Sequence, residues 1–209
     1  MKIMKKAVSV LLTLTMVLTI FTVVPVSVSA ASQSVDYVDE NGEIQTVTAA
    51  ILTGAETELS PGWYAVTEDI RFEDMVNLSA PDSAKDINLI LCDGATMLLT
   101  NEMQGFYSDD SVSLNIYGQS SGSGALKSQG GDFIFLMSPN ASLNIFGGEL
   151  TSSYINADYC TVTCAGDINI SAGTTEKCEL VSYNDLTVSG GSVNVPYLMA
   201  DQTDRKSVV

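Results

Sequence analysis

Short segments in which apolar and polar residues alternate recur along the chain from about residue 60 onward. The clearest of them span residues 87–91, 113–118, 142–147, 167–171 and 185–190. Each places two aliphatic residues at positions i and i+2 with one polar residue between them, which is typical of a strand with one buried face. That polar residue is Asn in four of the five segments and Thr in the last. Because no later stretch sustains the spacing of an amphipathic helix, we expect an almost purely β structure.

These segments follow one another at distances typical of a repeat. The step from Leu114 to Leu143 is 29 residues, the step on to Ile168 is 25, and the step on to Leu186 is 18. A strand-and-turn unit of this size cannot bury its own apolar face and stacks on the next unit, as in solenoid proteins. Because the period is uneven, we predict an all-β, right-handed parallel β-helix rather than a strict hexapeptide helix.

The competing fold is an antiparallel sandwich or jelly roll, which also has short strands at regular spacing. A sandwich gives no reason for the sequence Leu-Asn-Ile-aromatic-Gly to recur at 114–118 and 143–147. Stacked coils place like residues above like residues, and each buried aliphatic member of a column contributes about 1.5–3 kcal/mol. We therefore expect two buried columns, one of Leu114, Leu143 and Ile168 and one of Ile116, Ile145 and Ile170.

The N-terminal 30 residues differ from the rest of the chain. Three lysines within the first six residues precede an uncharged, mostly aliphatic run at 7–24 and small residues at 28–30. This order predicts a secretory signal peptide over residues 1–30, cleaved after Ala30. An uncleaved membrane anchor is the alternative, because about 18 apolar residues can just span a bilayer. We expect cleavage, a secreted extracellular protein and no membrane association afterwards.

Residues 31–60 begin with a polar stretch in which Asn41-Gly42 predicts a hairpin turn. An EF-hand calcium loop is excluded, because counting back from Gly42 as its sixth position puts Tyr37 in place of the first carboxylate ligand. Since the first coil of a solenoid needs a cover, we expect 31–60 to form an N-terminal cap and 61–203 to form the coils.

Residues 204–209, Asp-Arg-Lys-Ser-Val-Val, break with the sequence before them. They resemble the translation of a common sequencing adapter, which predicts a non-native tail and a reading frame that continues beyond Thr203. A short native basic tail is the alternative. On the first interpretation the chain is an N-terminal fragment, and any attachment to the cell surface lies in the missing C-terminal region.

The composition narrows the functions that this chain supports. With 9 Lys and Arg, 25 Asp and Glu and no His, the chain carries a formal charge of −16. Removal of the three leader lysines leaves 6 basic against 25 acidic residues, a net −19. The lack of histidine excludes Ser-His-Asp, Cys-His and histidine–zinc sites. A surface this negative repels phosphate backbones, so we exclude nucleic acid as a partner.

The expected mature chain has four cysteines, Cys92, Cys160, Cys164 and Cys178. An even number in a secreted chain permits disulfides, with three pairings open. We favour buried free thiols, because Cys160 and Cys164 share one strand face with Val162, and about 13 Å between their Cα atoms is too far to bridge. A zinc site is disfavoured by the C-x3-C spacing and the lack of histidine.

Three segments, in this order, carry a resemblance to a known family: Gly-Trp-Tyr-Ala-Val at 62–66, Asn-Leu-Ile-Leu-Cys-Asp-Gly-Ala-Thr at 88–96, and Ser-Leu-Asn-Ile-Tyr-Gly at 113–118 with its Gly/Ser-rich continuation to residue 126. They resemble the opening of right-handed β-helix modules, labelled carbohydrate-binding domains, in large secreted surface proteins of gut-type bacteria. The resemblance covers about residues 60–130 and implies an extracellular stalk or binding module. The family's glycine-rich coils are replaced here by 130–136, which leaves a shared ligand site open.

A polysaccharide lyase or hydrolase is the catalytic alternative, since β-helix enzymes mostly cleave acidic polysaccharides. Such sites need clustered carboxylates beside Arg or Lys. In the expected mature chain the basic residues before the tail are only Arg71, Lys85, Lys127 and Lys177, and none pairs with an Asp motif at matching coil positions. The pair Asp109-Asp110 is typical of a solvated turn, and turns are also predicted at Asp93-Gly94 and at Asp132. We therefore expect no catalytic residues.

Glycan binding is the second alternative, because sugar rings pack on aromatic side chains beside fixed polar groups. The aromatic candidates are Trp63, Tyr64, Tyr107 and Tyr117, followed by Tyr154 and Tyr183. Structural roles compete with this interpretation, since Trp63 lies at the solenoid entrance and Tyr117 occupies the same repeat position as Phe146. The carboxylates leave calcium (Ca2+) open as a ligand, but no spacing singles out a metal site.

The expected function is therefore an extracellular structural or adhesin-type module of a bacterial surface protein, without catalysis or a required cofactor. The expected partners are glycans or a host or cell-wall surface. Secretion, repetition, acidity and few aromatic residues are all that this function needs.

Overall fold

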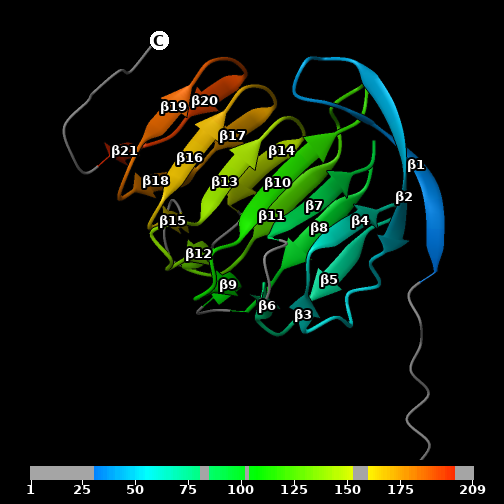
Figure 1. Ribbon diagram of the computed structural model, residues 1–209, viewed down its shortest axis with the longest axis horizontal. Coiled ribbons are helices and arrows are strands. Elements are labelled where there is room, and N and C mark those ends of the chain that lie inside the picture. The colour runs from blue at the N-terminus through cyan, green and yellow to red at the C-terminus, as the bar shows by residue number, and fades with distance from the viewer. Residues whose placement is uncertain (1–30, 81–84, 102–103, 153–159, 201–209) are drawn as a thin grey trace, which may run out of the picture.

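The computed structural model describes residues 31–80, 85–101, 104–152 and 160–200. Within these ranges every regular element is a β-strand (Figure 1). The predicted signal peptide and the tail at 204–209 lie outside the described residues, as does Tyr154. The described part of the chain contains no helix long and apolar enough to cross a membrane.

The strands form three sheets. Sheet 1 has 8 strands, in the order β1 (Ser32–Val38), β2 (Ile44–Ile51), β4 (Gly62–Val66), β7 (Asp86–Leu91), β10 (Ser113–Gly118), β13 (Ser142–Ile145), β16 (Asp167–Ile170) and β19 (Leu186–Val188). Sheet 2 has 6 strands: β5 (Ile70–Phe72), β8 (Thr96–Leu99), β11 (Ala125–Ser128), β14 (Glu149–Ser152), β17 (Thr174–Glu176) and β20 (Ser192–Asn194). Sheet 3 has 7 strands: β3 (Glu58–Leu59), β6 (Val76–Leu78), β9 (Gln104–Ser108), β12 (Asp132–Leu136), β15 (Cys160–Cys164), β18 (Cys178–Ser182) and β21 (Tyr197–Ala200).

From β4 onward the chain visits the three sheets in turn, so that each set of three consecutive strands makes one coil. Coil 1 is β4–β6, coil 2 is β7–β9, coil 3 is β10–β12, coil 4 is β13–β15, coil 5 is β16–β18 and coil 6 is β19–β21. All pairing between coils is parallel within the described residues (Figure 1). The predicted right-handed parallel β-helix is confirmed, and the sandwich alternative is wrong.

The two predicted aliphatic columns are confirmed in register. Leu114 pairs with Leu143 and Leu143 with Ile168, while the second column follows two residues later along the same strands. The six side chains of these columns are at most 1% exposed. Because strand side chains alternate between faces, both columns point into the helix and the asparagines between them point out. The interior of the solenoid is therefore a dry aliphatic stack.

Glycine allows close stacking at the corner that follows the sheet 1 strands. A Cβ atom on Gly118 would lie 2.6 Å from the backbone nitrogen of Gly148, and one on Gly147 would lie 2.6 Å from the nitrogen of Gly118. Any larger side chain would push coils 3 and 4 apart at this corner. The glycines that end the repeated sequence units are thus required by the stacking itself.

The N-terminal segment forms the predicted hairpin. β1 and β2 pair antiparallel from Ser32↔Ala50 to Val38↔Ile44, and Gly42 lies in the loop with a φ of 82°. β2 then pairs in parallel with β4, which joins the hairpin to the first coil. In Figure 1 the hairpin runs along one edge of the solenoid, and its loop bends toward the middle coils. Asp132, which the sequence suggested for a turn, instead begins β12.

The interior positions of coil 6 differ from those of the coils beneath it. Leu198 is 51% exposed, whereas Leu180, its partner in coil 5, is fully buried. Leu186, Val188 and Val193 are only partly buried. In the described residues no further coil packs over these side chains, so apolar surface and strand edges are exposed together at this end.

Candidate functional site

Two of the predicted binding residues, Trp63 and Tyr117, meet on the outer face of sheet 1. Their rings are stacked, with centroids 5.3 Å apart and an interplanar angle of 29°. Trp63 comes from β4 and Tyr117 from β10, with β7 between them. The side chain of Ile90 on that intervening strand is fully buried although alternation places it on the outer face. An extra layer therefore covers this part of the sheet.

The hairpin supplies that layer. Tyr37 of β1 lies 4.8 Å from Trp63 and 4.9 Å from Tyr117, measured between ring centroids. On the other side of Tyr117, Phe146 stacks at 5.0 Å with an angle of 24°. We call Tyr37, Trp63, Tyr117 and Phe146 the aromatic row. The predicted stacking of Tyr117 on Phe146 is confirmed, whereas the contribution of Tyr37 was not foreseen.

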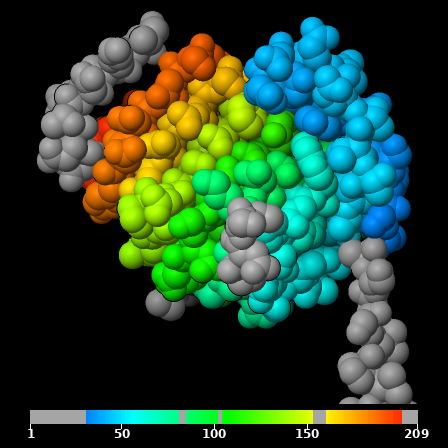
Figure 2. All heavy atoms as spheres, in the orientation of Figure 1, coloured from blue at the N-terminus to red at the C-terminus, as the bar shows by residue number. Residues whose placement is uncertain are grey.

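Polar contacts hold the hairpin over the coils. The Gln119 side-chain amide, which follows β10, donates a hydrogen bond of 2.7 Å to the backbone carbonyl of Asp36. Inside the loop, Asp39 accepts bonds of 2.9 Å from the backbone amides of Asn41 and Glu43. The Glu43 amide in particular lowers the pKa of Asp39. In Figure 2 the blue spheres of the hairpin adjoin the green spheres of the middle coils, in agreement with these contacts.

A ladder of asparagine side chains lies beside the aromatic row on the same face. The Asn115 amide donates to the oxygen of Asn88 at 2.9 Å, Asn144 donates to Asn115 at 2.8 Å, and Asn169 donates to Asn144 at 2.9 Å. At the base of the ladder Asn88 donates to the carbonyl of Gly62. Asn88, Asn115 and Asn144 thus each use both a donor and an acceptor, and Asn169 donates at the end of the ladder. These bonds satisfy the polar groups of the buried Asn88 and Asn115.

The other two predicted binding residues lie elsewhere. Tyr64 follows Trp63 on β4 but pairs with inward-facing Leu89, and its hydroxyl donates to the carbonyl of Ser60 at 2.8 Å. Tyr107 belongs to sheet 3, where its hydroxyl donates to Asp109 at 2.7 Å and its ring stacks on Phe135 at 6.2 Å. The four predicted residues therefore make no single site.

The aromatic row is an acidic as well as an apolar environment. Burial, together with the nearby carboxylate of Glu40, raises the pKa of Tyr117 to about 12. Burial and the charges of Asp39 and Glu40 also raise the pKa of Tyr37. Both phenols therefore stay protonated at neutral pH, and the row offers neither a base nor a phenolate nucleophile.

Two hollows of the described surface are small. One, of about 150 Å³, lies under the hairpin loop and is lined by Asp36, Tyr37, Val38, Ile44, Asp93, Gln119 and Ser120. The other, of about 270 Å³, lies on coil 1 and is lined by Gly54, Ala55, Glu56, Thr57, Arg71, Phe72, Glu73 and Asp74. Both are below the usual size of a small-molecule pocket.

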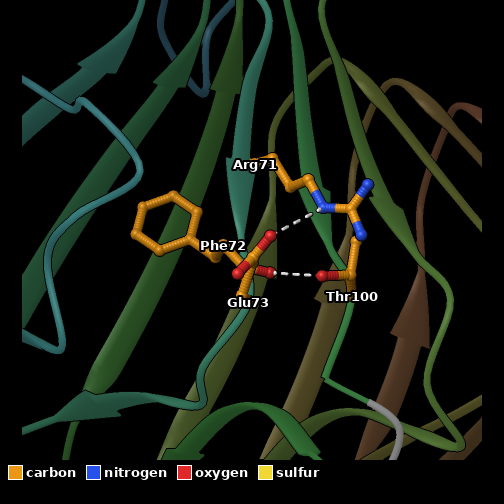
Figure 3. A network of polar contacts seen from close by, with 4 residues as sticks. All are labelled: Arg71, Phe72, Glu73 and Thr100. Atoms are coloured by element: carbon orange, nitrogen blue, oxygen red, sulfur yellow. Dashed lines mark hydrogen bonds and ion pairs between the residues drawn. The ribbon is translucent and has the colours of Figure 1, made fainter.

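Arg71, one of the few basic residues, lies in the larger hollow among carboxylates. Its Nε atom is 3.7 Å from Glu73, and the two side chains are 58% and 80% exposed (Figure 3). Thr100 on the next coil donates a 2.9 Å hydrogen bond to the carbonyl of Phe72 and fixes the backbone there. An exposed ion pair of this kind contributes little and presents a neutralised cation to a polyanionic substrate.

Other carboxylates serve turns and loops. Asp110 accepts a 2.8 Å bond from the backbone amide of Ala80, and its own backbone amide donates to the hydroxyl oxygen of Ser108 at 3.1 Å. Asp93 precedes Gly94, which has a φ of 79°, and accepts backbone bonds from Ser121 and Ser123. Among the described residues no group of three or more Cys, Asp or Glu side chains is arranged to hold a metal ion.

Comparison with protein-family models, with curated proteins and with solved structures finds no match for this chain.

Proposed function

We propose that this chain is a non-catalytic structural segment, of stalk or adhesin type, of a secreted bacterial surface protein. The observation that carries the proposal is that the rings of the aromatic row pack on one another and are covered by the hairpin. The rings of Trp63 and Tyr117, two of the four residues predicted to bind sugars, stack on one another and lie under Tyr37. A platform covered by the protein's own hairpin serves cohesion between cap and coils rather than ligand capture.

The surface and the interior support the same proposal. The interior columns run through coils 2 to 5 and are fully buried, which gives a rod-like segment a continuous core. The hollows are shallow, and the strongly acidic composition favours solubility and repels anionic polymers. The resemblance of 62–66, 88–96 and 113–126 to β-helix modules of bacterial surface proteins points the same way.

Carbohydrate binding is the second candidate, and one observation favours it. Phe146, at the end of the aromatic row farthest from Tyr37, is partly exposed and directly follows β13, a strand of the sheet that carries the asparagine ladder. An exposed ring near amides is a combination that sugars recognise. A glycan would then lie across coils 4 and 5, away from Trp63.

A glycan array separates the two candidates. We expect the full chain to give no saturable signal, and Phe146→Ala to give the same background. Saturable binding that is lost in Phe146→Ala and kept in Phe135→Ala, an aromatic residue on sheet 3, would overturn the structural proposal in favour of glycan binding. Incubation with pectin and alginate tests the enzymatic alternative, since new reducing ends or unsaturated products would contradict a non-catalytic role.

The extracellular location is tested separately by fusing the full chain to alkaline phosphatase, which becomes active only outside the cytoplasm. We expect an active fusion whose activity is lost when Leu11→Arg and Leu12→Arg interrupt the apolar run of the leader, and is kept in the control Ser9→Ala. An inactive parent fusion would contradict secretion.

A further inference from the structure

Two cysteines from neighbouring coils face each other inside the solenoid. Cys160 at the start of β15 is the register partner of Cys178 at the start of β18. Their sulfur atoms are 3.3 Å apart, and the two side chains are 1% and 0% exposed. As predicted, Cys160, Val162 and Cys164 are all buried on one face of β15. The close sulfur contact of Cys160 is therefore with Cys178 on the neighbouring coil and not with Cys164 on its own strand.

We propose that Cys160 and Cys178 form a disulfide that links coil 4 to coil 5. Adjacent strands lie about 4.8 Å apart, which falls within the 4.4–6.8 Å range of Cα separations found across disulfides. The sulfurs need to approach by only about 1.2 Å more to reach bonding distance, a movement that side-chain rotation supplies. Cys164 pairs instead with Ser182, so the register selects one of the pairings left open by the sequence.

The chemistry is thiol–disulfide exchange with an external disulfide, either a disulfide-bearing oxidoreductase or oxidised glutathione. One cysteine thiolate attacks the oxidant's S–S bond, forms a mixed disulfide and releases one oxidant thiol. The second cysteine then attacks the protein sulfur of the mixed disulfide and releases the other thiol. The two protein thiols lose two protons and two electrons, and the oxidant's disulfide is reduced to two thiols.

The buried environment sets when this exchange can occur. The hydrogen bond that the Cys178 thiol shares with Cys160, followed by burial, raises the pKa of Cys178, so its thiolate is scarce once coil 5 has packed on coil 4. Oxidation therefore accompanies folding, before the coils close over the two sulfurs. The inference rests on the proposed extracellular location for its oxidising environment, although the bond itself is tested in solution.

The test is refolding of the full chain from denaturant with reduced and oxidised glutathione, followed by alkylation and trypsin digestion. Cleavage after Lys127, Lys177 and Arg205 places Cys160 and Cys164 in peptide 128–177 and Cys178 in peptide 178–205. We expect a disulfide between these two peptides. We also expect its reduction to shift the unfolding equilibrium on the order of a hundredfold toward the unfolded chain, since it closes a loop of 18 residues.

Matched variants assign the bond. The linked peptides should persist in Cys164→Ala, which is equally buried on the same strand, and disappear in Cys160→Ala. A fully alkylated parent chain, or a link that survives Cys160→Ala, would overturn the proposal. Peptide mapping does not require the variants to be stable. Failure of the phosphatase fusion or a positive glycan array would contradict the proposed function and leave this result unchanged.

Discussion

The ring of Tyr37 in the hairpin lies edge-on to the ring of Tyr117 in coil 3, with centroids 4.9 Å apart and an interplanar angle of 68°. This contact joins β1, which pairs in the sheet with β2, to β10, which lies two coils beyond β4, the strand that pairs with β2. A hairpin held only through β2 would leave the outer face of β7 open. Tyr37 and Tyr117 instead close that face, which is why Ile90 is fully buried.

We expect Tyr37→Ala to loosen the hairpin without unfolding the coils. The substitution removes two ring contacts and exposes apolar surface under the hairpin, at a cost of about 2 kcal/mol. Hydrogen exchange should quicken in Ser32–Val38 and stay unchanged in β13 and β16. Tyr183→Ala, at a tyrosine that is 53% exposed, is the control and should change the free energy of unfolding by less than about 0.5 kcal/mol. Uniform loss of protection across all coils would contradict this role for Tyr37.

The raised pKa of Tyr117 predicts that the folded protein loses stability at alkaline pH. This pKa is raised from 10.0 to about 12 in the folded protein, so between these values the folded chain holds a proton that the unfolded chain has released. Stability from this group is therefore complete below about pH 10 and falls as the pH rises toward 12. Urea unfolding of the parent and of Tyr117→Phe, measured from pH 8 upward, should show a steeper decline for the parent. Parallel curves would contradict the buried position of the phenol.

The repeated units of the sequence were sufficient to predict the coils, because a solenoid stacks like on like. Leu114 and Leu143 hold equivalent positions in the sequence unit, and the structure places them in one column. The hairpin turn at Gly42 could also be predicted, because a turn depends only on neighbouring residues. The position of Tyr37 could not be predicted, since nothing in residues 32–51 indicates over which face the hairpin bends.

The candidate site was predicted only in part for the same reason. The spacing of Trp63, Tyr64 and Tyr107 does not say which side of a strand faces in, and the structure assigns them to three different environments. The spacing of two cysteines in the sequence does indicate that they lie on neighbouring coils. Cys160 and Cys178 are separated by 18 residues, the same step that separates Ile168 and Leu186, the register partners of coils 5 and 6 in sheet 1.

Thr175 offers a substitution that should stabilise the protein. It lies in an interior column between Leu150 and Val193 and is fully buried, and its hydroxyl has no hydrogen-bond partner among the residues that the structure describes. Thr175→Val keeps the shape and removes an unsatisfied polar group, so the free energy of unfolding should rise by about 1 kcal/mol. Thr187→Val, at an exposed position on the outer face of β19, is the control and should have an effect near zero. A loss of stability in Thr175→Val would show that the hydroxyl is satisfied after all.

The interior columns predict a steep contrast between coils 4 and 6. Leu143 is fully buried between Leu114 and Ile168, so Leu143→Ala leaves a cavity that coils on both sides prevent from collapsing. We expect a loss of about 2–5 kcal/mol. Leu198 occupies an interior position of coil 6 but is 51% exposed, and Leu198→Ala should cost less than about 1 kcal/mol.

Denaturant unfolding of both variants measures this contrast. If the columns hold the coils together, the two leucine substitutions must differ in cost although both residues occupy interior positions of their coils. Equal losses would mean that burial between coils is not what stabilises the rod, and that the exposed end of coil 6 is covered in solution. A partner over that end would also make the cost of Leu198→Ala depend on protein concentration, which the same measurement detects.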